Sequence, residues 1–312
     1  MYSVFSTDYK LNAKAMTHIP VLLHESIQGL AIKEGGIYVD CTTNRGGHSI
    51  EIAKTLGKKG TLICIDLDQE ALASAEKTLR EIKNAPTFHF VHSNFRHLKG
   101  ILSTLSISHV DGILADLGLS SQELDESGRG FSFRFDEPLQ MTFNAHPTED
   151  MVTAEEIVNY WSGETIADIL YAYSDEAYRG RIARAIVEYR KEKPIKTTHQ
   201  LVEIIASVVP ASYRHRKTHF ATKTFQALRM AVNDELGSIN ELIESLPSIL
   251  NPHGRACFIT FHSTEDRIVK QGLRARSDTL KIINKKAIVP QERELQENPR
   301  ARSAQLRIIE KI

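Results

Sequence analysis

The chain lacks several features that would assign it to a class of protein at once. It has only three cysteines in 312 residues, namely Cys41, Cys64 and Cys257. Each of them lies in an apolar strand pattern, which indicates a buried core residue rather than a disulfide partner. No apolar run reaches the roughly 20 residues of a membrane span, and residues 1–15 lack the basic-then-apolar order of a secretory signal. These absences argue against a disulfide-rich secreted protein and against a membrane protein, and they favour the cytoplasm.

An excess of charge is also missing, because 39 basic residues balance 39 acidic ones. Global charge therefore argues neither for nor against a nucleic-acid partner, which would need a local basic patch. The sequence has no His/Cys cluster with the spacing of metal ligands, so no metal is predicted. With 41% hydrophobic residues, a chain of this length can build one or two domains with a large core.

The most informative segment that is present covers residues 38–49. An apolar run ends in Asp40, a glycine-containing turn follows, and an amphipathic stretch begins. This order predicts a strand, a tight turn and a helix, with room for a cofactor close to the backbone. A second predicted strand ends in Asp66, where an acid suits the two hydroxyls of a nucleoside ribose. Together they indicate a nucleoside cofactor, although Gly46 and Gly47 could also form a turn that binds nothing.

Apolar strand patterns alternate with helical ones along the chain, which predicts a doubly wound, mostly parallel α/β sheet of seven strands. The expected strands are residues 37–41, 61–66, 87–91, 111–116, 255–261, 281–288 and 305–310.

The fourth and fifth strands are separated by far more chain than a crossover helix needs. Helical patterns fill this gap at residues 154–161, 166–173, 176–191, 198–208 and 219–246. The last has a continuous apolar stripe and is expected to be one long helix packed on the sheet. We therefore expect residues 1–134 and 215–312 to form the core, and residues 135–214 to form an inserted helical subdomain for substrate recognition.

The turn after the first strand argues against a nicotinamide oxidoreductase, because it lacks the Gly-x-Gly-x-x-Gly fingerprint. Its looser form fits a turn that binds S-adenosylmethionine in Rossmann-like methyltransferases. The fourth predicted strand ends at Asp116. Because sheets of this kind bind ligands beyond the carboxyl ends of their strands, Asp116 is placed to meet a ligand. An acid there is more often a helix cap or a turn residue, but the next helical pattern is far away. The Asn/Asp-Pro-Pro-aromatic motif of DNA amino-methyltransferases is absent.

Eight longer motifs occur in an order found in one family. They are HIPVLLHE (18–25), RGGHS (45–49), DLGLSS (116–121), RGFSF (129–133), TFQALR (224–229), VNDEL (232–236), FHS with EDRIVK (261–263 and 265–270) and NPRARS (298–303). Over nearly its whole length the chain resembles the MraW family, the small-subunit ribosomal RNA methyltransferases H. The resemblance implies the class I methyltransferase fold and S-adenosylmethionine-dependent methylation of a cytidine N4 in the decoding region of 16S rRNA. It also implies the small ribosomal subunit as partner and suggests a homodimer.

Carried over to this sequence, the resemblance implies cofactor contacts from Gly46, Gly47, His48, Asp66, Phe95, Asp116 and Glu123. Asp66 would hold the ribose, Phe95 would lie beside the adenine and Asp116 would lie near the methionine end. Core packing is the competing explanation for Phe95.

The chain departs from the family at several positions. Asn44 stands where the family commonly has Gly, although Asn tolerates a left-handed backbone better than most residues. Glu123 stands where it usually has Gln, and residues 140–144 replace Asp-Met-Arg-Met-Asp with an uncharged sequence. These changes motivate a second hypothesis: a catalytically weakened RNA-binding or ribosome-assembly protein that retains the fold.

The chemistry requires an oxygen that accepts a hydrogen bond from the cytosine amine. Asp116 is the candidate, because carboxylates accept from cytosine N4, with Ser120 or Ser121 as a second acceptor. Phe131 and Phe133 are candidates to support the extruded base, with core packing as an equal alternative, and Arg129 beside them is a candidate RNA contact. The segment after Phe261 is expected to be a helix start capped by Ser263.

Basic side chains cluster in and after the expected insert. Solvated charge is the ordinary explanation for any one cluster, but clusters on a neutral chain make phosphate contacts plausible. The predicted RNA contacts there are Arg181, Arg184, Arg214, Arg216 and Lys217.

Overall fold

The computed structural model describes residues 20–119, 124, 127–145, 147–148 and 151–312. Within this part of the chain, a seven-stranded sheet has the order β3-β2-β1-β4-β5-β7-β6. Its strands are β1 Ile37–Asp40, β2 Thr61–Asp66, β3 Thr87–His92, β4 Val110–Asp116, β5 Leu250–Thr260, β6 Leu280–Ile282 and β7 Gln305–Lys311.

The first five strands run parallel, and β7 is antiparallel to both β5 and β6. The prediction of a seven-stranded, mostly parallel α/β sheet is therefore confirmed. The strand at 61–66 lies where the sequence predicts it, whereas the one expected at 281–288 is only the three-residue β6. Because the strand order reverses between β1 and β4, a crevice is expected beyond their carboxyl ends.

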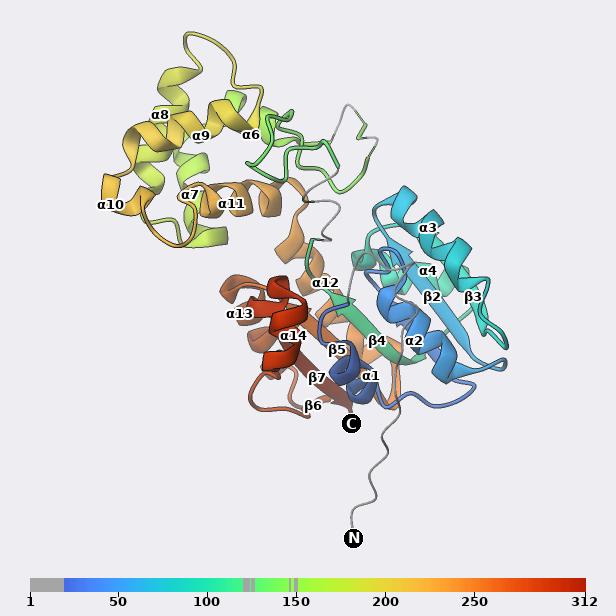
Figure 1. The fold of residues 1–312 in the computed structure, drawn as a ribbon. Coiled ribbons are helices and arrows are strands. Elements are labelled where there is room, and N and C mark those ends of the chain that lie inside the picture. The colour runs from blue at the N-terminus through green and yellow to red at the C-terminus, as the bar shows by residue number, and fades with distance from the viewer. Residues whose placement is uncertain (1–19, 120–123, 125–126, 146, 149–150) are drawn as a thin grey trace.

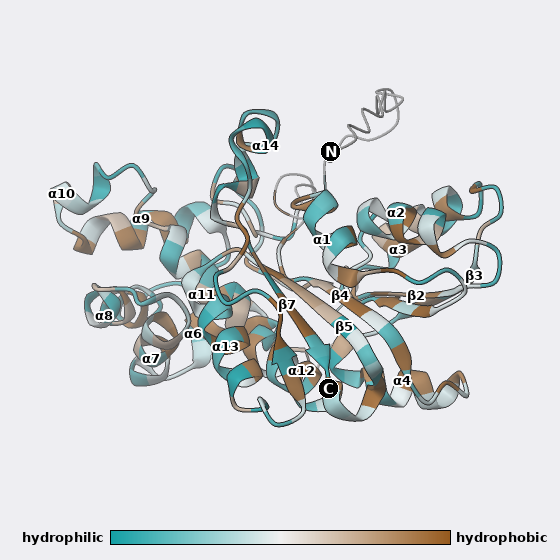
Figure 2. Cartoon of the chain, turned by 90° about the horizontal axis from the view of Figure 1, so that it is seen from below, coloured by the Kyte–Doolittle hydropathy of each residue, from teal (hydrophilic) through white to brown (hydrophobic). Residues whose placement is uncertain are grey.

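Helices cover both faces of the sheet (Figure 1). One face packs against α1 (Leu23–Leu30), α2 (Gly47–Leu56) and α3 (Gln69–Leu79). The other face packs against α4 (Leu98–Thr104), α12 (Glu235–Ile249) and α13 (Ser263–Arg274). Apolar colouring runs along β7 in Figure 2, whereas α13 and α14 (Glu292–Glu297) are mostly hydrophilic.

A helical body stands off one end of the sheet domain (Figure 1). It contains α6 (Ala154–Tyr160), α7 (Gly163–Ser174), α8 (Arg179–Tyr189), α9 (Thr198–Val208), α10 (Ala211–Arg214) and α11 (Thr222–Val232). These helices bury a hydrophobic cluster that is separate from the two clusters of the sheet domain. The body therefore has its own core, as an inserted subdomain requires.

The prediction of one long helix over residues 219–246 is wrong. The chain forms α11 and α12 instead, with a break at Asp234, whose φ of 43° is left-handed. Phe225 and Leu228 of α11 belong to the core of the helical body, whereas Ile239 and Leu242 of α12 belong to the core under the sheet. We therefore place the end of the helical insert at Val232 rather than at residue 214.

The three cysteines are buried and unpaired, as their strand patterns predict. Among the described residues, the longest apolar helices fall short of what a bilayer crossing needs.

Candidate functional site

A cavity of about 650 Å³ lies beyond the carboxyl ends of β1, β2 and β4. The sheet domain contributes Asn44, Asp66 and Asp116 to its wall, and the segment entering the helical body contributes Phe133 and Phe143. The cavity therefore lies where the crevice of a doubly wound sheet is expected, and it is closed on one side by the insert.

The turn between β1 and α2 brings the backbone close to this cavity. Gly46 precedes α2 with φ 86°, a left-handed conformation that favours glycine. A Cβ on Gly47 would stand 2.5 Å from Cγ of Pro20, so only glycine fits there. Asn44 also has a left-handed backbone, with φ 47°. Asn44 therefore adopts a conformation that the glycine common in the family could also adopt, so the substitution does not require a different turn.

Asp66 is held rigidly at the end of β2. One carboxylate oxygen accepts a hydrogen bond from the Asn44 amide at 2.6 Å, and the other accepts one from the Asp68 amide at 2.9 Å. Phe95, in the short 3₁₀ helix η1 (Phe95–His97), is half-buried: it packs on the core of the sheet domain and also lines the cavity.

Asp116 ends β4 with its side chain one-fifth exposed. Its Oδ1 is buried and has no hydrogen-bond partner among the described residues, while Oδ2 lies 3.8 Å from Nδ1 of His48. Burial raises the pKa of this carboxyl to about 8, with further contributions from Asp40 and Glu265. An acceptor atom without a partner at the edge of a ligand-sized cavity is the strongest indication of a binding role in this site.

The buried ring of His48 is oriented by the Val21 carbonyl, which lies 3.0 Å from Nε2. A carbonyl can only accept, so Nε2 carries a proton and donates it to this bond, which fixes the ring with Nδ1 toward Asp116. Beneath them, Asp40 accepts a 2.6 Å hydrogen bond from the Ser49 hydroxyl, and burial raises the Asp40 pKa to about 6. Acids therefore concentrate at this edge of the sheet.

A second polar group lies at the cavity where α11 meets α12 and α13. Arg229 of α11 makes a two-bond ion pair with Glu235 of α12, at 2.7 and 2.8 Å. Glu265 lies 3.8 Å from Arg229 and 2.8 Å from Nε2 of His262. Burial raises the pKa of Glu235, while the arginine opposes that shift. This group bridges the helical body and the sheet domain.

The expected cap of α13 needs correction. His262 is the N-cap, and its Nδ1 accepts from the Glu265 amide, whereas Ser263 is the first helical residue. Glu265 and Asp266 occupy the first turn of α13, where acids suit the helix dipole.

Arg129 also differs from its predicted role as an RNA contact. Its side chain is only 8% exposed, and it donates to Asp68 at 2.9 Å and to the carbonyls of Thr142 and Phe143. A guanidinium with these internal partners is not available to bind a phosphate.

The neighbouring aromatic residues divide between the two predicted alternatives. Phe131 is buried in the core of the helical body and stacks on Phe143, with ring centres 5.8 Å apart, although it also reaches the cavity wall. Phe133 stacks on His219 at 4.2 Å and lines the cavity.

The other predicted RNA contacts are exposed on the helical body. Tyr178 and Tyr213 meet edge to face at 4.8 Å, with Arg181 over the first ring and Arg216 over the second. Two basic clusters that are distant in sequence are thus joined through an aromatic pair. Arg214 and Lys217 lie beside Arg216 along the chain.

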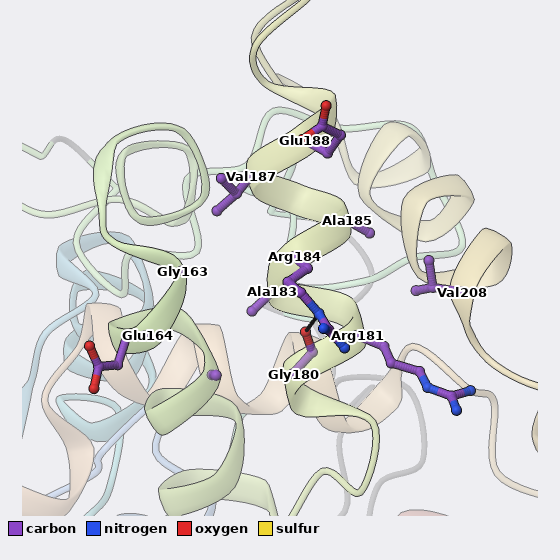
Figure 3. Close-up of a pocket in the computed structure, with 11 residues that line it drawn as sticks. Gly163, Glu164, Gly180, Arg181, Ala183, Arg184, Ala185, Val187, Glu188 and Val208 are labelled. Carbon is purple, nitrogen blue, oxygen red and sulfur yellow. Dashed lines mark hydrogen bonds between the residues drawn. The ribbon is translucent and has the colours of Figure 1, made fainter.

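Arg184 takes part in a different feature, an open depression lined by α7, α8 and Val208. Figure 3 shows Arg181 extending away from α8, whereas Arg184 folds back to the carbonyl of Gly180, at 3.0 Å. Glu164 and Glu188 also line the depression, so its charge is balanced.

Three predicted site residues, Ser120, Ser121 and Glu123, lie outside the described residues. Conversely, four residues without a predicted role line the cavity, namely Phe143, Arg229, Asn233 and Glu235. Three of these four belong to the motifs at 224–229 and 232–236, so their motif membership was the available signal. Over the described ranges, no group of three or more His, Cys, Asp or Glu side chains could hold a metal ion.

Comparison with known proteins gives consistent results. A sequence model of the family described as the MraW methylase family matches residues 15–312. Ribosomal RNA small subunit methyltransferase H from Brevibacillus brevis is 45% identical, and the match covers 95% of this chain and 98% of that protein. The protein of the same name from Clostridioides difficile is 42% identical over 95% of this chain and 99% of its own length. Among solved structures, an rRNA methylase from Streptococcus thermophilus aligns over 96% of this chain and 99% of its own, with TM-score 0.43 and 11% identity.

Proposed function

The chain belongs to the MraW methylase family, whose methyl donor is S-adenosylmethionine, and we propose that it methylates N4 of a cytidine in the decoding region of 16S rRNA. The proposed substrate is the small ribosomal subunit or its rRNA. The observation that carries the proposal is Oδ1 of Asp116, a buried acceptor without a partner among the described residues, in a cavity that also contains Asp66.

The residues present fit a nucleoside cofactor with a charged methionine end. Gly46 and Gly47 leave the turn without side chains next to the cavity, and Gly47 lies against Pro20 where a Cβ would clash. Asp66 would accept from ribose hydroxyls, since its carboxylate is already fixed by two backbone amides. Phe95 would cover one face of the adenine, because its ring lines the cavity near η1.

The proposed mechanism assigns Asp116 to the acceptor base. The cofactor supplies a methyl group already activated by its sulfonium. The cytosine amine is a poor nucleophile, because its lone pair is delocalised into the ring. A hydrogen bond from N4–H to Oδ1 of Asp116 would orient that lone pair toward the methyl carbon. Much of the rate gain would come from holding the amine and the methyl in line.

A proton must leave N4 as the new N–C bond forms and the sulfur–carbon bond breaks. Asp116 would take this proton in its ionised form, and with a pKa near 8 the carboxylate is basic enough to do so near neutral pH. Nδ1 of His48 lies 3.8 Å from Oδ2, on the far side of the carboxylate from the proposed contact between Oδ1 and the amine. Ser120 and Ser121 remain predicted as second acceptors.

The target base would enter the cavity from the side of the helical body. The target cytidine must leave its stack to reach the cavity, and Phe133 would support the extruded ring. The exposed cluster of Arg181, Arg214, Arg216 and Lys217 would bind phosphates, because it continues along the chain to His219, which stacks on Phe133.

The hypothesis of a weakened assembly protein has less support. Asn44 adopts a left-handed backbone, so this departure from the family keeps the turn. Residues 141–143 are held by Arg129 and Asn233, so the loop without the family's charges is still fixed to its surroundings.

Methyl transfer to small subunits from cells lacking this gene tests the proposal. Subunits are incubated with the protein and labelled S-adenosylmethionine, and the modified nucleotide is mapped by mass spectrometry. We expect one methyl group on N4 of one decoding-region cytidine, and no transfer by Asp116→Ala. A methyl group on another base or atom would refute the proposed specificity, and tight binding without transfer would favour the assembly protein.

A further inference from the structure

A buried arginine connects the two ends of the cavity. Arg129 lies on the segment that leaves the sheet domain for the helical body, and its side chain is 8% exposed. Nη2 donates to Oδ2 of Asp68 at 2.9 Å, and Nη1 donates to the carbonyl of Thr142 at 3.0 Å and to that of Phe143. Only a planar guanidinium offers donors in a fork that can reach all three acceptors at once.

Asp68 belongs to the turn that carries Asp66. Its Oδ1 caps α3 by accepting from the Glu70 and Ala71 amides, while its own amide donates to Oδ1 of Asp66 at 2.9 Å. The position of the Asp66 carboxylate, the start of α3 and the guanidinium of Arg129 are therefore fixed by one another.

The other end of this connection is the roof of the cavity, residues 141–143. The Met141 amide donates to the Arg129 carbonyl at 2.7 Å. From α11, Oδ1 of Asn233 accepts from the Phe143 amide at 2.8 Å, and Nδ2 donates to the Met141 carbonyl at 2.7 Å. The ring of Phe143 lines the cavity. The roof is thus held by Arg129 from the sheet side and by Asn233 from the helical side.

We propose that Arg129 is a positioning residue that couples ligand binding at Asp66 to the position of the cavity roof at Thr142 and Phe143. The inference rests on the proposed function, since it takes Asp66 as the ribose contact. A ligand bonded to the Asp66 carboxylate restrains the 66–68 turn, the turn restrains Arg129, and Arg129 restrains the roof that faces the acceptor base. Coupling of this kind is reciprocal, so the nucleic-acid substrate also raises cofactor affinity.

Hydrogen exchange with S-adenosylhomocysteine as the probe tests the coupling without requiring catalysis. In the wild-type protein, a saturating amount should slow exchange of residues 139–143 by at least about five-fold, the lower end of typical coupling between sites. Arg129→Lys keeps the charge but loses the fork. Asp68→Asn keeps a good helix cap and loses the ion pair. In both variants the ligand should still bind, and the slowing should fall below about two-fold.

Arg255→Lys is the matched control. Arg255 also bonds a carboxylate, Glu310 at 2.9 Å, and a backbone carbonyl, Gly29 at 3.2 Å. It pairs with Gly112 in β4, four residues before Asp116, and so lies away from the cavity edge. This variant should keep the wild-type response.

The same coupling should be seen in substrate affinity. S-adenosylhomocysteine should tighten the binding of unmethylated small subunits to the wild-type protein. In Arg129→Lys this ligand-induced gain in subunit affinity should be largely lost. Equal ligand-dependent protection in wild type, Arg129→Lys and Asp68→Asn would overturn the inference, as would a wild-type protein that binds the ligand without protection of residues 139–143. Wild-type methyl transfer in either case would leave the proposed function standing.

Discussion

Replacing Asp116 with Asn should stabilise the protein while removing its activity. Asp116 has its pKa raised from 3.8 to about 8, chiefly by burial. Between these two values the native carboxyl keeps a proton that the unfolded chain has lost. The free energy of unfolding of the wild type therefore falls as the pH rises through this window. An amide of nearly the same shape does not titrate, so Asp116→Asn avoids the loss.

The size of the effect follows from the pKa. At about 1.4 kcal/mol for each pH unit, the window from 3.8 to about 8 gives an upper bound of about 6 kcal/mol. The side chain is one-fifth exposed to a cavity that admits water, which lowers the realistic value to about 2–3 kcal/mol. The difference should be near zero at pH 4, grow up to pH 8 and remain constant above it.

Denaturant unfolding of both proteins at pH 4, 6, 8 and 9 measures this difference, and the comparison at pH 4 is the internal control. Methyl transfer by the same samples should be lost in the variant at every pH, and in the wild type it should rise as Asp116 ionises. A stability difference that does not change between pH 4 and 8, or a variant less stable than the wild type at pH 8, would refute the description of Asp116 as a buried, poorly satisfied carboxyl.

Three further changes test separate parts of the molecule. Gly47→Ala should lower stability by about 1–3 kcal/mol and weaken cofactor binding, because its Cβ meets the rigid ring of Pro20 at 2.5 Å; thermal unfolding and calorimetry measure both. Tyr213→Phe should cost about 1–3 kcal/mol, since it removes the 2.8 Å bond to the buried Glu176, and unchanged cofactor affinity would show that the loss is confined to the helical body. A triple alanine variant should weaken RNA binding and reduce the slope of log K against log salt by up to about 3, whereas an unchanged slope would remove these side chains from the interface; the residues are Arg214, Arg216 and Lys217.

The sheet could be predicted because its information is local. Strands such as Thr61–Asp66 combine a short apolar run with an acid at the end, and the helical patterns between them have the length of crossover helices. The turn at Gly46 and Gly47 was equally visible, because its glycines and the following amphipathic stretch are adjacent in the sequence.

The break between α11 and α12 could not be predicted in this way. The apolar stripe continues from Phe225 to Leu246 without a proline or glycine at the break, and the stripe alone indicates one helix. The interruption is fixed by distant contacts: Arg96 pairs with Asp234, and Asn233 binds the roof at residues 141–143. Asp tolerates the left-handed backbone that these contacts impose.

The role of Arg129 was hidden for a similar reason. An arginine beside two phenylalanines resembles a nucleic-acid contact, and its partner Asp68 lies 61 residues earlier in the chain. Partnership across such a distance cannot be seen in a single sequence, whereas an acid at a strand end such as Asp66 or Asp116 can be placed from topology alone.

The connection between the helical body and the sheet domain is short at α11. α11 is part of the core of the helical body and, through Phe225 and Arg229, also a wall of the cavity. It passes into α12 through a turn of only two residues, Asn233 and Asp234. If the helical body tilted on binding a large partner, α11 would therefore carry that movement to the cavity beside Asp116. The volume of the cavity would then depend on the angle between α11 and α12, and so on how a partner binds the helical body.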